Sequence, residues 1–176
     1  RSCSSAASDV YKRQLQYLAV SNIDKPIGKI IYTQFLNSRG GIEADLTISR
    51  TGEEEFYIVT GSAFGVHDRS WIEKHSPRDG SVVIDDLTEK FGVINLCGPH
   101  ARDVLQNVTD NDISNETLPF SSYADIRVAG HPVRAMRIGY VGELGWEMHM
   151  GREDMPAVYR ALAEAGSKYD LSLIHI

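Results

Sequence analysis

Residues 29–60 read KIIYTQFLNSRGGIEADLTISRTGEEEFYIVT, which is the strongest fold signal in the chain. Residues 29–36 and 55–60 are rich in the β-branched and aromatic side chains that favour strands. Turn-forming residues at 37–41 and at 51–53 separate them from a third strand at 42–50. Three strands with such short links predict an antiparallel meander.

The strand at 42–50 alternates apolar and polar side chains. Successive side chains of a strand point to opposite faces, so each set takes one face. We expect the apolar set to face a core and the polar set to face outward. The apolar set is Ile42, Ala44, Leu46 and Ile48, and the polar set is Glu43, Asp45, Thr47 and Ser49.

The rest of the chain predicts a mixture of helices and strands. We expect helices from a Ser62 cap to about residue 75, after Gly98-Pro99, and from an Asp154 cap to Gly166. Strands are expected at 82–84, at 91–96, which is nearly all apolar and therefore central, in a hairpin over 126–137, and at 146–150. Strands outnumber helices and come in runs, which predicts an α+β fold with antiparallel sheets and packed helices.

Composition excludes several classes of protein. The chain has 176 residues and a formal net charge of -6, with no basic stripe for nucleic acid. No apolar run approaches the roughly 20 residues that span a bilayer, so no membrane association is expected. Cys3 and Cys97 lie far apart, and the six histidines form no metal set, with His67 and His75 expected at the surface. A reducing compartment fits, either the bacterial cytoplasm or the mitochondrial matrix.

The two ends of the chain look foreign to the rest. Residues 1–14 read RSCSSAASDVYKRQ without helical or strand periodicity, and residues 171–176 read LSLIHI. Both resemble translated sequencing-adapter reads, although a disordered start and a short final strand are the alternative. We expect residues 1–14 and 171–176 to be non-native, and residues 15–170 to be part of one longer domain.

The first candidate for chemistry is GGIEADL at residues 40–46. The paired glycines allow a tight turn and close approach of a ligand to the backbone. Asp45 follows on the strand and offers a carboxylate for acid or base work. The alternative is that Asp45 is an ordinary solvated residue of the strand's outer face.

The second candidate is GYVGELGWE at residues 139–147. A carboxylate beside an aromatic side chain can bind a flat heterocycle through two parallel N–H donors. The alternative is a glycine-rich hairpin whose Trp146 fills the core. The glycine spacing matches neither GxGxxG nor GxxxxGK, so no phosphate loop is predicted.

Three motifs in register resemble the glycine-cleavage aminomethyltransferase family across residues 29–166. They are LNSRGGIEADL at 36–46, LCGPHA at 96–101 and GYVGELGWE at 139–147, where Val141 replaces a threonine. FYIVTGS at 56–62, the helix around His67 and the single acid Asp45 after Ala44 resemble the branch fused to dimethylglycine and sarcosine dehydrogenases.

The resemblance implies a tetrahydrofolate-binding domain that loads a one-carbon unit from a small N-methyl or aminomethyl donor. The family's catalytic aspartate falls on Asp45, and its pterin-binding glutamate falls on Glu147. Tyr32 and Tyr140 become candidate walls for the pterin, with core packing as the alternative, and Glu143 ranks below Glu147. In the dehydrogenases the folate traps an iminium as 5,10-methylenetetrahydrofolate.

The resemblance leaves three partners and activities open. In a dehydrogenase, a covalently linked FAD domain would oxidise the amine, with FAD bound only in a part missing from this chain. In a stand-alone glycine-cleavage aminomethyltransferase, a lipoyl protein would replace that domain. A non-catalytic regulatory protein of the same fold is the third possibility, and Asp45 argues against it. The family's later Arg-Leu-Glu segment is absent here, which implies a partial site.

Overall fold

The computed structural model describes the backbone of residues 5–173 and the side chains of residues 12–173. The chain divides between Asp85 and Asp86 into two compact units. Each unit has its own antiparallel sheet and its own hydrophobic core, which confirms the predicted α+β class. No helix within residues 5–173 is long and apolar enough to cross a bilayer.

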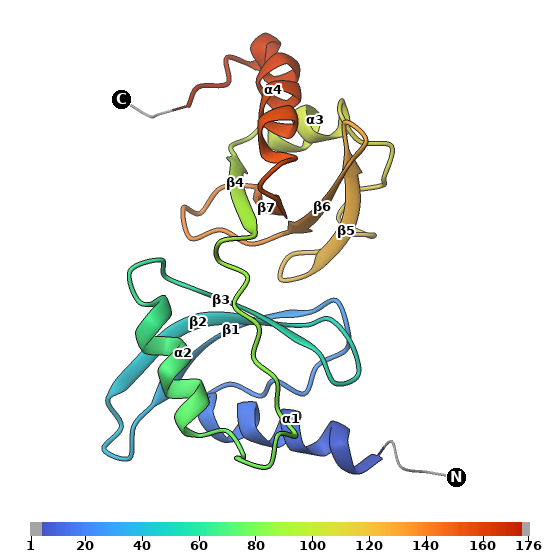
Figure 1. Ribbon diagram of the computed structural model, residues 1–176. Coiled ribbons are helices and arrows are strands. Elements are labelled where there is room, and N and C mark those ends of the chain that lie inside the picture. The colour runs from blue at the N-terminus through green and yellow to red at the C-terminus, as the bar shows by residue number, and fades with distance from the viewer. Residues whose placement is uncertain (1–4, 174–176) are drawn as a thin grey trace. The chain divides into compact units, whose positions relative to one another are not determined.

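The first unit is a three-stranded meander with helices on one face (Figure 1). Strands β1 (Ile30–Leu36), β2 (Ile42–Arg50) and β3 (Phe56–Thr60) pair in that order, all antiparallel, as predicted. Helices α1 (Ser5–Leu18) and α2 (Gly65–Lys74) contribute Leu15, Leu18 and Ile72 to the core that the apolar face of β2 builds. Asp45 of the polar set on β2 is exposed.

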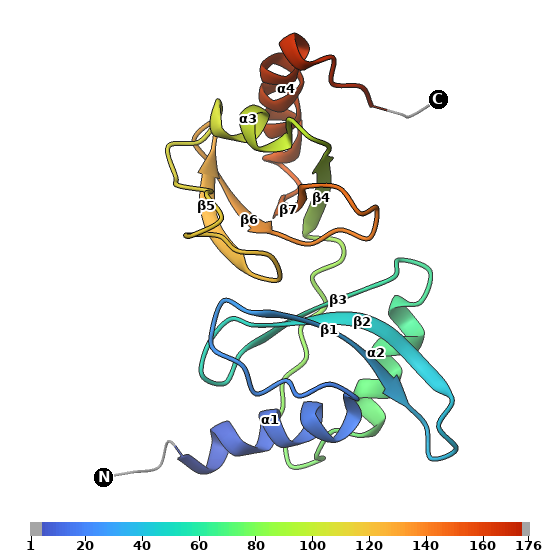
Figure 2. The same cartoon turned by 180° about the vertical axis from the view of Figure 1, so that it is seen from behind.

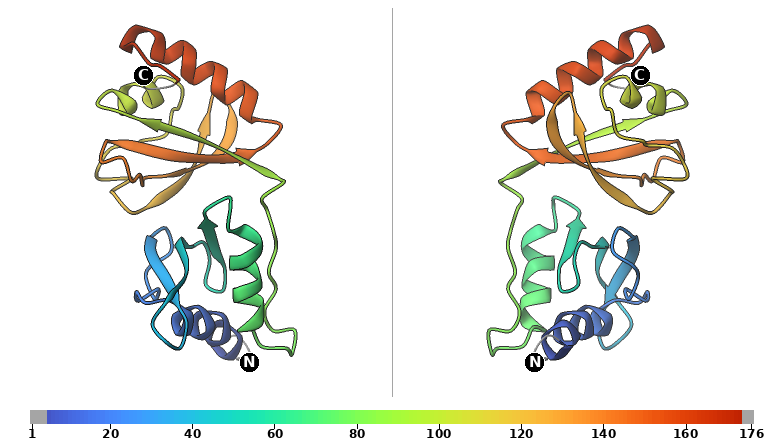
Figure 3. Two further views of the ribbon diagram at one scale, coloured as in Figure 1. Left: turned by 90° about the vertical axis from the view of Figure 1, so that its left-hand side faces the viewer. Right: turned by 90° about the vertical axis from the view of Figure 1, so that its right-hand side faces the viewer.

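The second unit is a four-stranded sheet covered by helices. Strands β4 (Phe91–Cys97), β5 (Tyr123–Val128), β6 (His131–Met136) and β7 (Gly145–Gly151) lie in the order β4-β7-β6-β5, and every pair is antiparallel. Helices α3 (Ala101–Gln106) and α4 (Met155–Gly166) pack on its apolar face, and the 3-10 helix Ser167–Tyr169 follows (Figures 2 and 3). The predicted hairpin and the last strand are confirmed.

Several sequence expectations about the elements are wrong. Residues 82–84 pair with no strand in the described chain, because they lie outside both sheets. Strand β4 lies at the edge of its sheet and pairs only with β7 among the described strands, so it is not central. Its side chains are exposed on one face, as at Phe91 and Val93, and buried on the other, as at Leu96. Ile42 lies at the rim of the sheet and is exposed, whereas Ser49 is fully buried.

The helix boundaries also differ from those expected. Residues from Ser5 are helical, because alanine, lysine, glutamine and leucine favour a helix and because Leu15 and Leu18 pack into the core. Ser62 does not cap α2, which starts at Gly65. Asp154 precedes α4 without capping it, since its carboxylate pairs with Nδ1 of His131 at 2.7 Å. The foreign origin of residues 1–14 and 171–176 stays a prediction.

Candidate functional site

Asp45 lies on the open face of the first sheet with both carboxylate oxygens engaged. The Tyr32 hydroxyl donates a hydrogen bond to Oδ2 at 2.9 Å, and the Gln34 amide donates to Oδ1 at 3.0 Å. The hydrogen bond to Asp45 is the main reason that the pKa of Tyr32 is raised above its ordinary value, and partial desolvation adds to the effect. The carboxylate is therefore oriented while it remains exposed to solvent.

The strand register explains this arrangement. Gln34 lies directly opposite Asp45 across the β1–β2 pair, and Tyr32 lies opposite Thr47, two residues along. Opposite and diagonal neighbours on one face of an antiparallel pair are close enough for long side chains to meet. Tyr32 is 64% exposed, so its ring is not a core residue and stays available to a ligand.

Glu147 lies on the outer face of the second sheet. Its side chain is 25% exposed, and across the strands it lies opposite Asn95 of β4 and Met136 of β6. The carboxylate lies 3.6 Å from Nε2 of His149, two residues further along the same strand. Glu147 is thus a partly exposed carboxylate at the centre of a sheet face.

The residues predicted around Glu147 line one small hollow. It has a volume of about 50 Å³ and is lined by Glu147, Glu143, Tyr140 and neighbouring residues of β4, β7 and the loop between β6 and β7. Tyr140 is 97% exposed, so it is not packed in a core. Trp146 is buried to 1% exposure, which matches the alternative in which this residue fills the core.

The predicted residues therefore fall into two groups. Tyr32 and Asp45 belong to the first unit, and Tyr140, Glu143 and Glu147 belong to the second. Each group is brought together within its own unit by strand register and by the loop before β7. A single site shared by Asp45 and Glu147 stays a prediction.

Sequence reasoning missed Gln34 and a charged cluster around His67. Nδ1 of His67 lies 2.9 Å from the buried carboxylate of Asp68, and Nε2 lies 3.5 Å from Glu43. The hydrogen bond with Asp68 is the largest cause of a raised pKa of His67, with Glu43 adding to it. Asp68 also accepts from the Thr60 hydroxyl. His67 is half-exposed, as expected for a surface residue, but its contacts with Asp68 of α2 and Glu43 of β2 link the helix to the strand.

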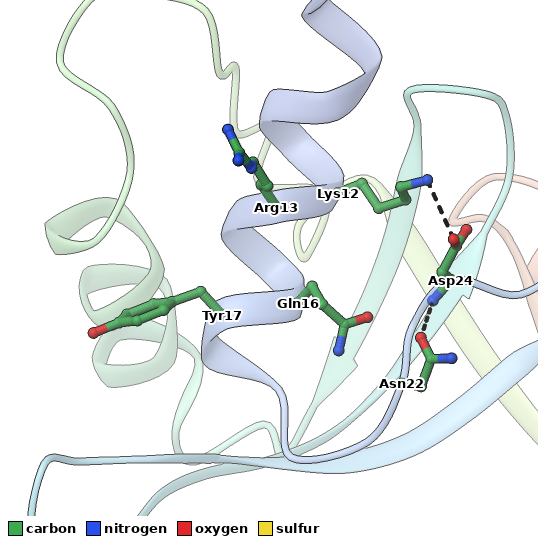
Figure 4. Close-up of a pocket in the computed structure, with 6 residues that line it drawn as sticks. All are labelled: Lys12, Arg13, Gln16, Tyr17, Asn22 and Asp24. Carbon is green, nitrogen blue, oxygen red and sulfur yellow. Dashed lines mark hydrogen bonds and ion pairs between the residues drawn. The ribbon is translucent and has the colours of Figure 1, made fainter.

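A larger hollow lies beside helix α1 (Figure 4). It measures about 650 Å³ and contains none of the predicted site residues. Its charged contact, between Lys12 and Asp24 at 3.3 Å, is exposed to solvent and of the kind that contributes little energy. Its lining residues are Lys12, Arg13, Gln16, Tyr17, Asn22 and Asp24. Within the described residues, no group of three or more potential ligands could hold a metal ion.

The fold, with two antiparallel sheets and packed helices, is an α+β fold of the aminomethyltransferase class. The chain belongs to the family described as GCVT N-terminal domain, whose profile matches residues 11–175. This match confirms the resemblance stated from the three sequence motifs.

Curated relatives support the same assignment. The chain is 37% identical to mouse mitochondrial sarcosine dehydrogenase over 91% of its length and 38% identical to human mitochondrial dimethylglycine dehydrogenase over 89%. It spans only about a fifth of these relatives, 19% and 18% respectively. An aminomethyltransferase of Thermus thermophilus is 35% identical over 88% of the chain, which covers 44% of that protein.

A solved structure shows the same fold. The glycine cleavage system aminomethyltransferase T of Bartonella henselae matches with a TM-score of 0.68 at 24% sequence identity. The match covers 86% of this chain and 40% of that protein.

Proposed function

We propose that this chain is a tetrahydrofolate-binding domain for one-carbon transfer, and that it acts within an FAD-dependent sarcosine or dimethylglycine dehydrogenase. The observation that carries the proposal is the exposed Asp45 carboxylate, which two side chains orient on an open sheet face. Such an arrangement suits a carboxylate that stabilises positive charge on a transferring group or relays its proton. The two dehydrogenases are among the relatives that match most of the chain.

The residues of the second unit fit the chemistry of a folate. Glu147 is a partly exposed carboxylate that can accept the two parallel N–H donors on the 2-amino-4-oxo edge of a pterin. Tyr140 offers an exposed aromatic face beside it, and Glu143 adds a second carboxylate to the same hollow. Since the hollow measures only about 50 Å³, the ring would lie against its rim and not inside it.

Each residue has a distinct role in this proposal. When bound, the folate supplies the nitrogen atoms that accept the one-carbon unit. Asp45 faces the positive charge on the arriving group, while Tyr32 and Gln34 hold its carboxylate in one orientation. Glu147 anchors the pterin edge, so its effect falls on binding, whereas the effect of Asp45 falls on the transfer step.

A calorimetric titration of the protein that contains this chain with tetrahydrofolate tests the proposal. We expect saturable binding that Glu147→Gln weakens roughly tenfold or more, because the amide presents a donor to the pterin donors. Glu164→Gln is the matched control, because this carboxylate is exposed on α4, away from the hollow. Absence of binding by the wild-type protein, or equal binding by the Glu147→Gln variant, contradicts the proposal.

A stand-alone glycine-cleavage aminomethyltransferase is the second candidate. The match to the Thermus thermophilus aminomethyltransferase favours it, because the chain covers a larger share of that protein than of the dehydrogenases. A lipoyl protein would then deliver the one-carbon unit, whereas a linked FAD domain would do so in the first candidate. Transfer from an aminomethylated lipoyl protein, measured with the protein that contains this chain, separates the two.

The relatives also bear on where the protein works. The dehydrogenases that match are named as mitochondrial, and the matching aminomethyltransferase comes from a bacterium. We propose that the protein works in a mitochondrial matrix or in a bacterial cytoplasm, and that folate, a small N-methyl or aminomethyl donor and the donor-oxidising domain are its partners.

A further inference from the structure

The outer face of the second sheet carries a row of charged side chains that leads to Glu147. Asp125 of β5 accepts from Nε and Nη2 of Arg134 of β6 at 2.8 and 2.9 Å. Arg134 lies opposite His149 of β7, and Nε2 of His149 lies 3.6 Å from the Glu147 carboxylate. Consecutive members of the row are related by a hydrogen bond, by strand register or by an ion-pair distance.

His149 is the buried member of this row. Its side chain is 3% exposed, although it lies on the outer face of the sheet, whereas Glu147 is 25% exposed. Its neighbour across the β4 pairing is the apolar Val93, and its neighbour across the β6 pairing is Arg134. A buried imidazole between two paired strands has a restricted rotamer, so its ring nitrogen has a fixed position beside a carboxylate that is 25% exposed.

A neighbour in a fixed position would help to hold the Glu147 carboxylate in the orientation that binds a ligand. A glutamate side chain loses up to about 2 kcal/mol of rotamer entropy when it is held in one conformation. A neighbour that orients the carboxylate before the ligand arrives reduces this cost of binding. In the described part of the chain, the imidazole of His149 lies within ion-pair distance of Glu147, with Nε2 at 3.6 Å from the carboxylate.

We propose that His149 is a positioning residue for Glu147, and that it orients the carboxylate toward the pterin edge through an N–H at Nε2. This inference rests on the proposed tetrahydrofolate binding and adds to it the residue that sets up the pterin contact. The distance of 3.6 Å exceeds a hydrogen bond, and a small rotation of the Glu147 side chain closes it. His149 does not touch the ligand in this proposal.

The test compares substitutions that keep or remove a donor at the Nε2 position. Tetrahydrofolate affinity of the protein that contains this chain is measured by calorimetry. His149→Leu keeps the volume, removes the donor and should weaken binding about tenfold, the size of one charge-assisted hydrogen bond. His149→Gln should restore most of the affinity, because its amide nitrogen reaches the place of Nε2. His149→Asn should not, because its amide reaches only the place of Nδ1.

A double-variant cycle distinguishes positioning from general packing. If His149 acts through Glu147, His149→Leu should cause no further loss of affinity in the Glu147→Gln background. Additive losses, or a His149→Asn variant that binds as tightly as His149→Gln, overturn the proposal. If His149→Leu does not fold, as judged by thermal unfolding, the comparison of the Gln and Asn variants still decides.

The outcomes also separate this inference from the proposed function. If Glu147→Gln weakens folate binding and His149→Leu does not, the positioning role is wrong and the folate site stands. If the wild-type protein that contains this chain does not bind tetrahydrofolate, both are wrong.

Discussion

At the scale of single residues, Asp45 is the side chain whose replacement should affect chemistry more than binding. In Asp45→Asn, the shape is kept and the charge is lost, and only one oxygen remains to accept from Tyr32 or Gln34. We expect the one-carbon transfer to slow about a hundredfold, or on the order of 3 kcal/mol, because one preorganised electrostatic contact is removed. Single-turnover formation of methylenetetrahydrofolate by the protein that contains this chain measures the effect.

The control for Asp45 is Asp85→Asn, which alters an exposed carboxylate at the last residue of the first unit. It should leave both folate affinity and transfer unchanged. In the dehydrogenase reading, amine oxidation at the flavin should survive Asp45→Asn, with formaldehyde released instead of the folate product. A variant that transfers at the wild-type rate removes Asp45 from the mechanism.

At the scale of elements, the pairing of β4 with β7 depends on the absence of a side chain at Gly145. A Cβ atom there would lie 2.6 Å from the Leu96 carbonyl oxygen and 3.0 Å from Cβ of Cys97. Because backbone atoms cannot move aside cheaply, we expect Gly145→Ala to lower the free energy of unfolding by about 1–3 kcal/mol. Denaturant unfolding measures this loss.

Gly139 provides the matched control in the same loop. A Cβ atom added there meets nothing within 4 Å. Gly139→Ala should therefore be neutral, or stabilising by up to about 1 kcal/mol, because it restricts the unfolded chain. Equal stability of the two variants would contradict the close approach of Gly145 to the Leu96 carbonyl oxygen.

The link between α2 and β2 should depend on pH through His67. Its pKa is raised above 6.5, chiefly by the hydrogen bond with Asp68, so the folded state binds the proton more tightly than the unfolded state. The resulting stability is fully present below the unfolded pKa and is lost as pH rises through the raised pKa. The free energy of unfolding should therefore fall as the pH rises above the ordinary histidine pKa of about 6.5.

The His67→Gln variant should lose much of this slope, whereas His100→Gln, which alters an exposed histidine of the second unit, should keep it. Thermal unfolding across the pH range measures both slopes. A parallel decline in the wild type and in His67→Gln would rule out the Asp68–His67–Glu43 cluster as its source.

At the scale of the whole molecule, the division between Asp85 and Asp86 predicts where a protease cuts first. Residues 79–88 contain no helix or strand, and most of them are exposed or half-buried. A protease that cleaves before aspartate should therefore produce two resistant fragments that meet near residue 85, because the two cores lie on either side. Mass spectrometry of a short digestion checks this, and early cleavage inside β2 or β7 would speak against two separate units.

Most of the fold could be predicted from local sequence patterns. The meander over residues 29–60 was predictable, because alternation and turn residues act over a few positions and agree with each other. The strands and the hairpin of the second unit followed from the same signals. The edge position of β4 was not predictable, because an apolar run does not reveal how many neighbours a strand has.

The candidate site divides in the same way. Asp45 and Glu147 were proposed from the motifs GGIEADL and GYVGELGWE, because short glycine-rich segments with a carboxylate can be recognised in the sequence and compared with those of a family. Gln34 was missed because it becomes a partner of Asp45 only when β1 and β2 pair in register. The contacts of His67 and His149 were missed because the burial of Asp68 and of His149, and the approach of Glu43 to His67, arise only in the folded chain.

The sequence by itself determined the α+β class, the meander and the family, because each is encoded in residues that lie close together along the chain, and through the family resemblance it proposed Asp45 and Glu147 as site residues. Only the tertiary structure decided that the chain forms two units, that Tyr32 and Gln34 hold Asp45, and that a buried histidine lies beside Glu147. The physical reason is that register, burial and the proximity of charges arise from pairing between distant segments, which no local pattern specifies.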